Sequence, residues 1–330
     1  MLRQNREMTR YNNISFTIAV YILLTFVFLL LVIGKISHSS SKSQDYTAKV
    51  KFFQPVIEKL LKKGVDSGFV FNLLANPKTQ FNEKYIRINV TGFLKKTTAP
   101  DRYDWRAVEK SRSFIIENES ILDSCERTYS VPREVITAVL WSETKLGDFL
   151  GTNHIASVFL STSMAYLPQF INLNIMYLTE NFSGDSTTLD SLEKKIYSRA
   201  IQKSNWAITE LVALAKLRNK LSTPVQELYG SWAGAFGIPQ FLPSSYLKWG
   251  VDGNDNKSID LFEIEDAIFS IGNFLKSNGW GSSQESQKKA LFAYNNSWDY
   301  VSRVLRLAGR IKARILQDVS PADSLKVNFN

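Results

Sequence analysis

The chain has 330 residues, of which 44% are hydrophobic and 12% aromatic, so it can form a large core and does not have a disordered composition. A formal net charge of +9 favours an acidic partner, but no motif of a nucleic-acid-binding module accompanies it, so we expect no nucleic-acid partner. The two histidines and the single cysteine, Cys125, exclude zinc sites built on several histidines and intrachain disulfides.

Near the N-terminus, residues 14–34 form an uninterrupted uncharged and mostly apolar run. As a helix rising about 1.5 Å per residue, this run matches the ~30 Å hydrocarbon core of a bilayer. A cleaved signal peptide is the alternative, but no small-residue cleavage pattern follows Gly34. We therefore predict a transmembrane signal anchor at 14–34, a cytoplasmic segment at 1–13 and a flexible Ser-rich tether at 35–49.

Beyond the tether, the hydrophobic pattern is predominantly helical and strand signals are scarce. Helices are expected at 55–63, 66–75 and 105–128, through Glu143, around Trp206, and at 265–277 and 286–310. Residues 81–96 carry β-branched side chains and receive no assignment. The fold class is mainly α, which we divide into a helical N-terminal subdomain at 50–128, a main domain at 129–312 and a C-terminal tail at 313–330.

The helix through Glu143 has sequence signals at both ends. Ser130 is a candidate N-cap, Pro132 lies in the first turn, where proline is tolerated, and Gly147 is expected to end the helix. These signals predict a helix that places Glu143 close to its C-terminus.

Glu143 lies on the apolar face of that helix. Ile136, Val139 and Leu140 precede it at helical spacing, so we expect its side chain to share their buried face. Burial and the negative end of the helix dipole both disfavour the carboxylate and raise its pKa, as a proton donor requires. The alternative is a last-turn glutamate that reaches water or pairs with Lys145.

Residues 230–246, GSWAGAFGIPQFLPSSY, combine glycines and prolines with aromatic residues, Ser231 and Gln240. Glycines let the backbone approach a ligand, aromatic rings offer faces to sugars, and serine and glutamine supply hydrogen bonds. An ordinary loop is the alternative, but the density of aromatic and polar groups favours a cleft lined for a ligand.

Residues 252–263 have the oxygen-ligand spacing of an EF-hand calcium loop. Lys257 occupies the position that normally needs glycine, and a polar loop that binds nothing is the alternative. We predict a weak structural calcium site, and no organic cofactor. Its expected ligands are Asp252, Asn254, Asn256, Ser258, Asp260 and Glu263.

Three motifs in this order resemble the membrane-bound lytic transglycosylase B family. They are Glu143 in WSETKLG, the pattern GSxAGAxGxxQFxPSSY from Gly230, and AYNNS from Ala293. The resemblance extends over approximately residues 52–308. It implies a lysozyme-like catalytic core at 129–312 with an EF-hand-like loop, preceded by the helical subdomain and one transmembrane helix.

The resemblance also implies roles for single residues. Glu143 matches the family's catalytic acid/base, and Phe274 lies where the family usually has a tyrosine, which leaves only stacking there. Lys203 lies near the family's glycan-binding arginines, although residues 157–199 align poorly. The expected substrate-binding residues are therefore Ser231, Gln240, Phe274, Tyr294, Asn295 and Lys203.

The function that the resemblance implies is peptidoglycan lytic transglycosylation. A single glutamate would cleave the β-1,4 bond between N-acetylmuramic acid and N-acetylglucosamine and form a 1,6-anhydro sugar, whereas most glycosidases use two carboxylates. The alternatives are a hydrolytic muramidase of the same fold, a non-catalytic peptidoglycan-binding or assembly protein, and a calcium-responsive membrane protein. Expected partners are glycan strands and other cell-wall enzymes. The protein is expected to cross the inner membrane once and to place its catalytic domain in the periplasm.

Overall fold

The computed structural model describes residues 44–94 and 105–319, and the chain divides into two compact units, residues 1–54 and 55–330. In the first unit, residues 44–52 are helical, so the predicted flexible tether is wrong over its last residues. The predicted anchor at 14–34 lies outside the described residues. Within the described ranges, no helix is long and apolar enough to span a bilayer.

Two short helices follow. Helices α2 (Gln54–Lys62) and α3 (Ser67–Ala75) confirm the two predicted ones, and the Asp66 carboxylate accepts a 2.9 Å hydrogen bond from the Phe69 N–H. The unassigned residues 81–96 contain α4 (Glu83–Thr91) and the 3₁₀ turn η1 (Gly92–Leu94). Tertiary burial of Ile86 and Val90 outweighs the β preference of their neighbours.

The next segment forms three helices. The single helix predicted at 105–128 is wrong, because the chain breaks at Asn118 between α5 (Trp105–Glu117) and α6 (Glu119–Tyr129). Ser130 ends α6 in the left-handed conformation (φ 57°) and is not the N-cap of α7 (Arg133–Thr144). The Glu126 carboxylate instead accepts a 3.0 Å hydrogen bond from the first N–H of α7.

Helix α7 also ends before the glycine that was expected to stop it. Lys145 is its C-cap, with φ 56°, and its N–H bonds back to the Leu140 and Trp141 carbonyls.

Three further helices follow, α8 (Ile155–Ser163), α9 (Pro168–Asn181) and α10 (Ser186–Leu217). Helix α10 confirms the helix predicted around Trp206, whereas α8 and α9 were not predicted. Every residue of α8 is buried. A helix that is buried on all sides has no amphipathic stripe, which explains why the sequence did not reveal it.

The remaining elements surround the glycine-rich segment. A short antiparallel pair, β1 (Asn153–His154) with β2 (Tyr229–Gly230), precedes α11 (Pro243–Trp249), while η2 (Val225–Glu227) lies before β2. Helix α12 (Ile264–Ser277) confirms the predicted one. The helix predicted at 286–310 is instead two, α13 (Gln284–Tyr294) and α14 (Trp298–Val319), so helix continues into the predicted tail.

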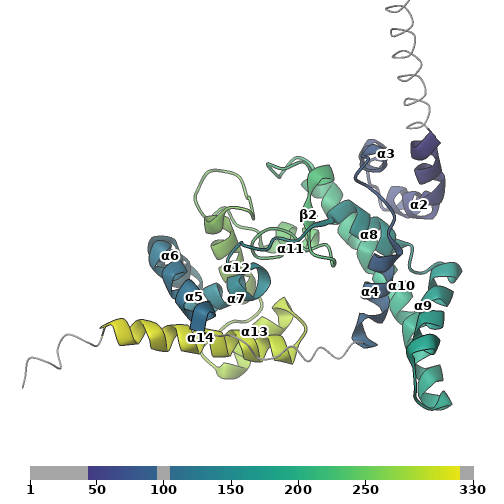
Figure 1. Ribbon diagram of the computed structural model, residues 1–330. Helices are drawn as coiled ribbons and strands as arrows, with labels where there is room; N and C mark the ends of the chain where they lie inside the picture. The colour runs from purple at the N-terminus through teal and green to yellow at the C-terminus, as the bar shows by residue number, and fades with distance from the viewer. Residues whose placement is uncertain (1–43, 95–104, 320–330) are drawn as a thin grey trace, which may run out of the picture. The chain divides into compact units, whose positions relative to one another are not determined.

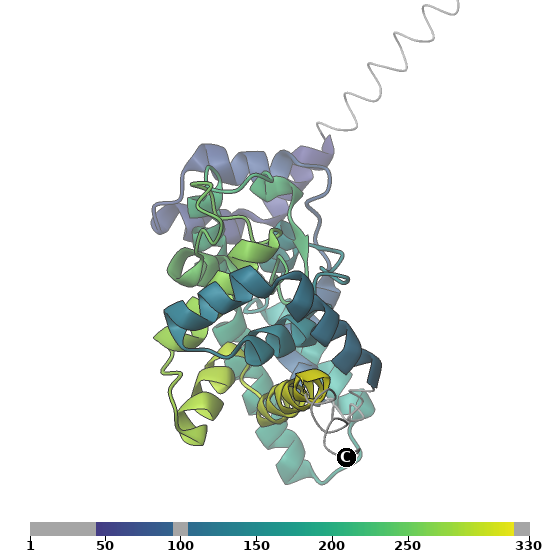
Figure 2. The same ribbon diagram turned by 90° about the vertical axis from the view of Figure 1, so that its left-hand side faces the viewer.

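Within the second unit, these helices gather into two groups (Figure 1). Helices α5–α7 pack with α12 and α14, and Figure 2 shows α14 in yellow beside them. Helices α4 and α10 pack against the buried α8, α9 packs against α4 and α10, and α11 contacts both α10 and α12. The mainly α fold is confirmed, with the glycine-rich segment between the two groups.

Candidate active site

Glu143 lies in the last turn of α7, and the residues before it on the helix form part of the core. Its Oε1 atom is buried, and no described residue donates a hydrogen bond to it. Burial raises the pKa of Glu143 from 4.5 to about 7, while the nearby Tyr300 hydroxyl and the charges of Arg303 and Lys145 oppose the rise. The carboxyl group can therefore donate and accept a proton near neutral pH.

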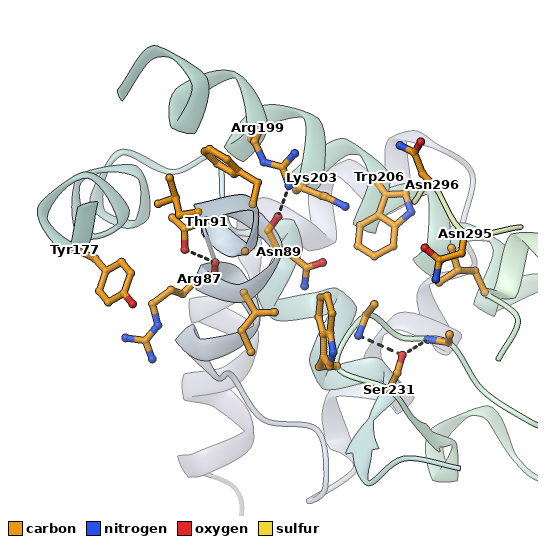
Figure 3. A pocket seen from close by; sticks show the side chains of 18 of the residues that line it. Arg87, Asn89, Thr91, Tyr177, Arg199, Lys203, Trp206, Ser231, Asn295 and Asn296 are labelled. Carbon is orange, nitrogen blue, oxygen red and sulfur yellow. Dashed lines mark hydrogen bonds between the residues drawn. The ribbon is translucent and has the colours of Figure 1, made fainter. Parts of the chain in front are cut away.

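Glu143 opens into a cleft of about 1270 Å³ that both helix groups line. Figure 3 shows Lys203 and Trp206 on α10 at one wall, Ser231 on another, and Asn295 and Asn296 after α13. Among the described residues that line the cleft, Glu143 is the one carboxylic acid. Six residues predicted from the sequence meet here: Glu143, Lys203, Ser231, Gln240, Tyr294 and Asn295.

The glycine-rich segment is folded back on itself at the base of the cleft. The Ser231 hydroxyl accepts hydrogen bonds from the Ala233 and Ala235 N–H groups at 3.3 and 3.1 Å. A Cβ atom on Gly234 (φ 81°) would lie 2.2 Å from the Phe159 ring, and one on Gly230 would lie 2.0 Å from the Ala235 carbonyl oxygen. Neither position has room for a side chain, so these glycines permit the fold of the cleft wall.

Gln240 and Tyr294 fix the far end of that segment. Gln240 has φ 52°, and its amide nitrogen donates to the Gly237 and Leu150 carbonyls at 2.8 and 3.2 Å. The Tyr294 hydroxyl donates to the Pro239 carbonyl at 2.5 Å. Burial, together with the charge of Glu143, holds the pKa of Tyr294 well above 10, so this tyrosine remains a proton-bearing donor.

Phe274 is not among the cleft residues, and this differs from the sequence prediction. Its side chain is buried in an aromatic cluster, with ring centroids 4.7 Å from Tyr294, 4.4 Å from Trp249 and 5.8 Å from Phe241. Because Phe274 packs against Tyr294, it supports a cleft residue without facing the cavity.

Glu210 is a buried carboxylate that the sequence did not single out. It lies on α10 and accepts hydrogen bonds from the Ser244 N–H and hydroxyl at 3.0 and 2.7 Å. Burial raises its pKa, and the two bonds from Ser244 oppose this rise. Glu210 therefore caps α11 from a neighbouring helix and joins the wall that carries Lys203 to the segment that carries Gln240.

Residues of α4 and η1 also line the cleft. The sequence did not indicate them, because both elements lie in the unassigned residues 81–96. Arg87 stacks over the Tyr177 ring at 5.4 Å. Arg199 donates to the Val90 and Asn89 carbonyls at 2.9 and 3.1 Å and stacks on Phe93, so it fixes the end of α4 to α10 (Figure 3).

The predicted calcium loop brings four of its expected ligands together. Asn254 and Asn256 donate to Glu263 Oε2 at 2.9 and 3.1 Å, and Asp252 accepts from the Asn256 and Lys257 N–H groups. Lys257 takes the left-handed conformation (φ 71°) that a glycine would adopt at this position.

Further hydrogen bonds hold the second half of this loop. The Asp260 carboxylate accepts from the Ser222 hydroxyl and from the Phe262 N–H. The buried Asp266 on α12 was not predicted from the sequence. Its carboxylate accepts hydrogen bonds from the Gly253 and Asp260 N–H groups at 2.7 and 2.6 Å and so connects the loop to α12. In the described ranges, no three His, Cys, Asp or Glu residues are grouped to hold a metal.

A comparison with protein families shows to which family this chain belongs. The model of the transglycosylase SLT domain matches residues 50–303, which is most of the chain. The chain belongs to the transglycosylase SLT domain family. The predicted resemblance to lytic transglycosylases is thereby confirmed.

One curated relative of this chain is a lytic transglycosylase. Membrane-bound lytic murein transglycosylase B of Escherichia coli (strain K12) is 28% identical over 188 residues, which are 57% of this chain and 41% of that protein. The matched region therefore spans less than half the length of this relative.

Solved structures show the same fold. The Escherichia coli lytic transglycosylase SLT35 in complex with calcium matches with a TM-score of 0.58 at 18% identity, over 80% of this chain and 94% of that one. Pseudomonas aeruginosa SltB3 in complex with NAG-anhNAM-pentapeptide matches with a TM-score of 0.57 at 17% identity, over 82% and 80% of the two chains. This SLT domain protein thus has their lysozyme-like fold.

Proposed function

We propose that this protein is a peptidoglycan lytic transglycosylase that cleaves the β-1,4 bond between N-acetylmuramic acid and N-acetylglucosamine. The observation that carries the proposal is Glu143, whose Oε1 atom is buried and receives no hydrogen bond from any described residue at the wall of a large cleft. Family membership and the lytic transglycosylase names of the similar proteins support it.

The chemistry follows from a single carboxyl group. With a pKa of about 7, Glu143 gives its proton to the glycosidic oxygen as the bond from that oxygen to C1 breaks. The substrate's own N-acetyl group stabilises the positive charge at C1. The 6-hydroxyl oxygen of the same sugar then bonds to C1, and its proton returns to Glu143, which closes the 1,6-anhydro ring.

A single-acid mechanism is consistent with the cleft. Hydrolytic glycosidases usually place a second carboxylate near the bond, either as nucleophile or to activate water. No other Asp or Glu lines the cleft in the described part of the chain. We therefore favour attack by the sugar's own hydroxyl over attack by water.

The other cleft residues would bind and orient the glycan. Trp206 and Trp232 line the cavity and offer ring faces to sugars, while Asn295 supplies amide donors and acceptors. Lys203, stacked on Trp206 at 4.6 Å, supplies a positive charge for a carboxylate of the substrate.

The calcium site is part of this proposal. The loop has the oxygen-ligand spacing of an EF-hand, hydrogen bonds link the side chains of Asn254 and Asn256 to Glu263, and one similar structure was solved in complex with calcium, which supports this proposal. The ion would contribute rigidity to the loop after α11 and would take no part in the reaction.

The proposed location is the periplasmic face of the inner membrane, with the anchor at 14–34. The E. coli relative is named as membrane-bound, and peptidoglycan lies outside the cytoplasm. A topology reporter fused after Asn330 should be active in the periplasm, and cytoplasmic activity would contradict this placement.

The direct test is Glu143→Gln, which keeps the size of the side chain but cannot deliver a proton. Release of soluble fragments from peptidoglycan should fall by about 10²–10⁴ or more, while sedimentation with peptidoglycan is retained. The matched control is Glu134→Gln in the first turn of α7, which should remain active. Full activity of Glu143→Gln would end the proposal.

A further inference from the structure

The last turn of α7 lies at one end of the cleft, together with the end of α13. The hydroxyl of Thr144, which follows Glu143, donates to the Ile238 carbonyl at 2.9 Å. The Tyr294 hydroxyl at the end of α13 donates to the next carbonyl, that of Pro239. The last turn of α7 and Tyr294 therefore meet at residues 238–239, and a bond that Glu143 cleaves must lie at this end.

A second end of the same cleft is formed by α4, α9 and α10. The residues that line it are Arg87, Tyr177, Asn181, Phe182 and Leu192. Figure 3 shows Tyr177 and Arg87 on one side of the cleft and Asn295, which follows Tyr294, on the other, with Lys203 between them. The cleft volume of about 1270 Å³ exceeds the ~300–1,000 Å³ of a typical small-molecule pocket, so there is room for a stretch of polymer.

The second end carries groups that suit a sugar ring. The side chains of Tyr177 and Phe182 are half-buried, so each keeps ring surface accessible to the cleft. The Asn181 amide nitrogen donates to the Tyr177 carbonyl at 2.8 Å, which leaves its Oδ1 atom as an acceptor for a hydroxyl group. Among the described residues, no acidic side chain lines this end, so it binds without a second catalytic acid.

Hydrogen bonds and stacking hold the second end in shape. Arg199 on α10 donates to the Val90 and Asn89 carbonyls at the end of α4, at 2.9 and 3.1 Å, and stacks on Phe93. Helix α9 packs against both α4 and α10, so the wall is formed before a ligand arrives and needs little ordering on binding. Because Arg199 is engaged in this way and Arg87 stacks on an aromatic ring, the aromatic and amide groups remain for a ligand, which favours glycan over a charged stem peptide.

We propose that this second end is a distal glycan subsite, which makes the enzyme act preferentially on long strands. The inference rests on the proposed function. Sugars bound at Tyr177 and Phe182 belong to the strand that is cleaved at Glu143 but are remote from the reacting bond. Once the strand is bound at Glu143, its contact with the second end is intramolecular and adds to the affinity. A disaccharide bound at Glu143 does not reach the second end and gains nothing from it.

The test is kcat/KM of the full-length protein on peptide-free glycan strands of increasing length. For the wild type, kcat/KM should rise with length until the strand reaches the second end. In the double variant Tyr177→Ala with Phe182→Ala, the ratio of kcat/KM between long and short strands should fall about tenfold, mainly through KM, because two ring faces are lost. The matched control is Met176→Ala with Tyr197→Ala, two exposed side chains of α9 and α10 that do not line the cleft, and it should keep the wild-type ratio.

Two results would overturn the inference. A residue pair that only stabilised the fold would lower kcat/KM by the same factor at every strand length and leave the ratio unchanged. If the double variant lost activity only on strands that carry stem peptides, whatever their length, the second end would bind peptide and not glycan.

A binding measurement separates this inference from the proposed function. Peptide-free strands can be bound to Glu143→Gln with and without the Tyr177→Ala and Phe182→Ala changes, and Kd for long strands should rise about tenfold while Kd for the shortest strands changes little. If the wild type cleaved no glycan but long strands showed this rise, the proposed function would fail and the subsite would stand. Cleavage by the wild type with no dependence of Kd on these rings would refute the subsite alone.

Discussion

Glu143 should make the folded protein less stable at neutral and alkaline pH, and Glu143→Gln should remove this cost. Folding raises the pKa of the carboxyl group from 4.5 to about 7, so the folded state binds the proton more tightly than the unfolded state does. The effect of this carboxyl group on stability therefore has the opposite pH dependence to that of a salt-bridged acid, whose pKa is lowered by folding. Any stability linked to this proton is present in full below pH 4.5 and is lost as the pH rises toward 7.

The loss of stability can be calculated from the change in the pKa of Glu143 on folding. At 1.36 kcal/mol per pKa unit, the carboxylate costs about 3 kcal/mol above pH 7, of which about 2–3 kcal/mol appears between pH 5 and pH 8. Glutamine does not titrate, so whatever constant difference it introduces cancels when the two pH values are compared.

Urea denaturation of both proteins at pH 5 and pH 8 measures the effect. The free energy of unfolding of Glu143→Gln, relative to wild type, should increase by about 2–3 kcal/mol from pH 5 to pH 8. Glu134→Gln should show no such pH-dependent gain. A difference between Glu143→Gln and wild type that is the same at both pH values would refute the argument that this carboxyl group is desolvated.

Two further variants test the supports of the cleft. Glu210→Ala removes both bonds to Ser244 and leaves a half-buried N–H and hydroxyl without their partner, so it should lower the free energy of unfolding by roughly 1–3 kcal/mol in urea. A loss below about 0.5 kcal/mol would show that α11 does not depend on this cap. Replacing Asp252 and Glu263 by Ala should abolish the rise in thermal midpoint on adding calcium, which is worth about 0.4 kcal/mol when calcium equals Kd, whereas the control Asp255→Asn should keep it. If millimolar calcium does not stabilise the wild type, the calcium proposal is wrong.

The sequence predicted those parts of the site that depend on local pattern. Glu143 stands out because an acid interrupts an apolar helical stripe, and that pattern is visible over two turns of chain. Ser231 and Gln240 lie in a segment whose glycines can be recognised without knowing what packs on them. Helices with a clear amphipathic stripe, such as α12, were found for the same reason.

The missed features depend on partners that are distant in the sequence. Nothing near Phe274 indicates that its ring packs under Tyr294, and nothing near Arg303 indicates that α14 lies against α7. The division of 105–128 at Asn118 depends on how α5 and α6 pack, and the role of Ser130 as a C-cap depends on how α6 and α7 meet. Helix α8 has no stripe because it is buried on all sides, so periodicity could not reveal it.

The central claim is that Glu143 transfers a proton both ways and that the substrate's own hydroxyl closes the product ring. Mass spectrometry of muropeptides released by the full-length protein, before and after borohydride treatment, tests it most directly. The account predicts 1,6-anhydromuropeptides, which have no reducible end and keep their mass after borohydride, with release almost lost in Glu143→Gln. Products that gain the mass of a reduced end would show that water attacks and that the enzyme is a hydrolytic muramidase.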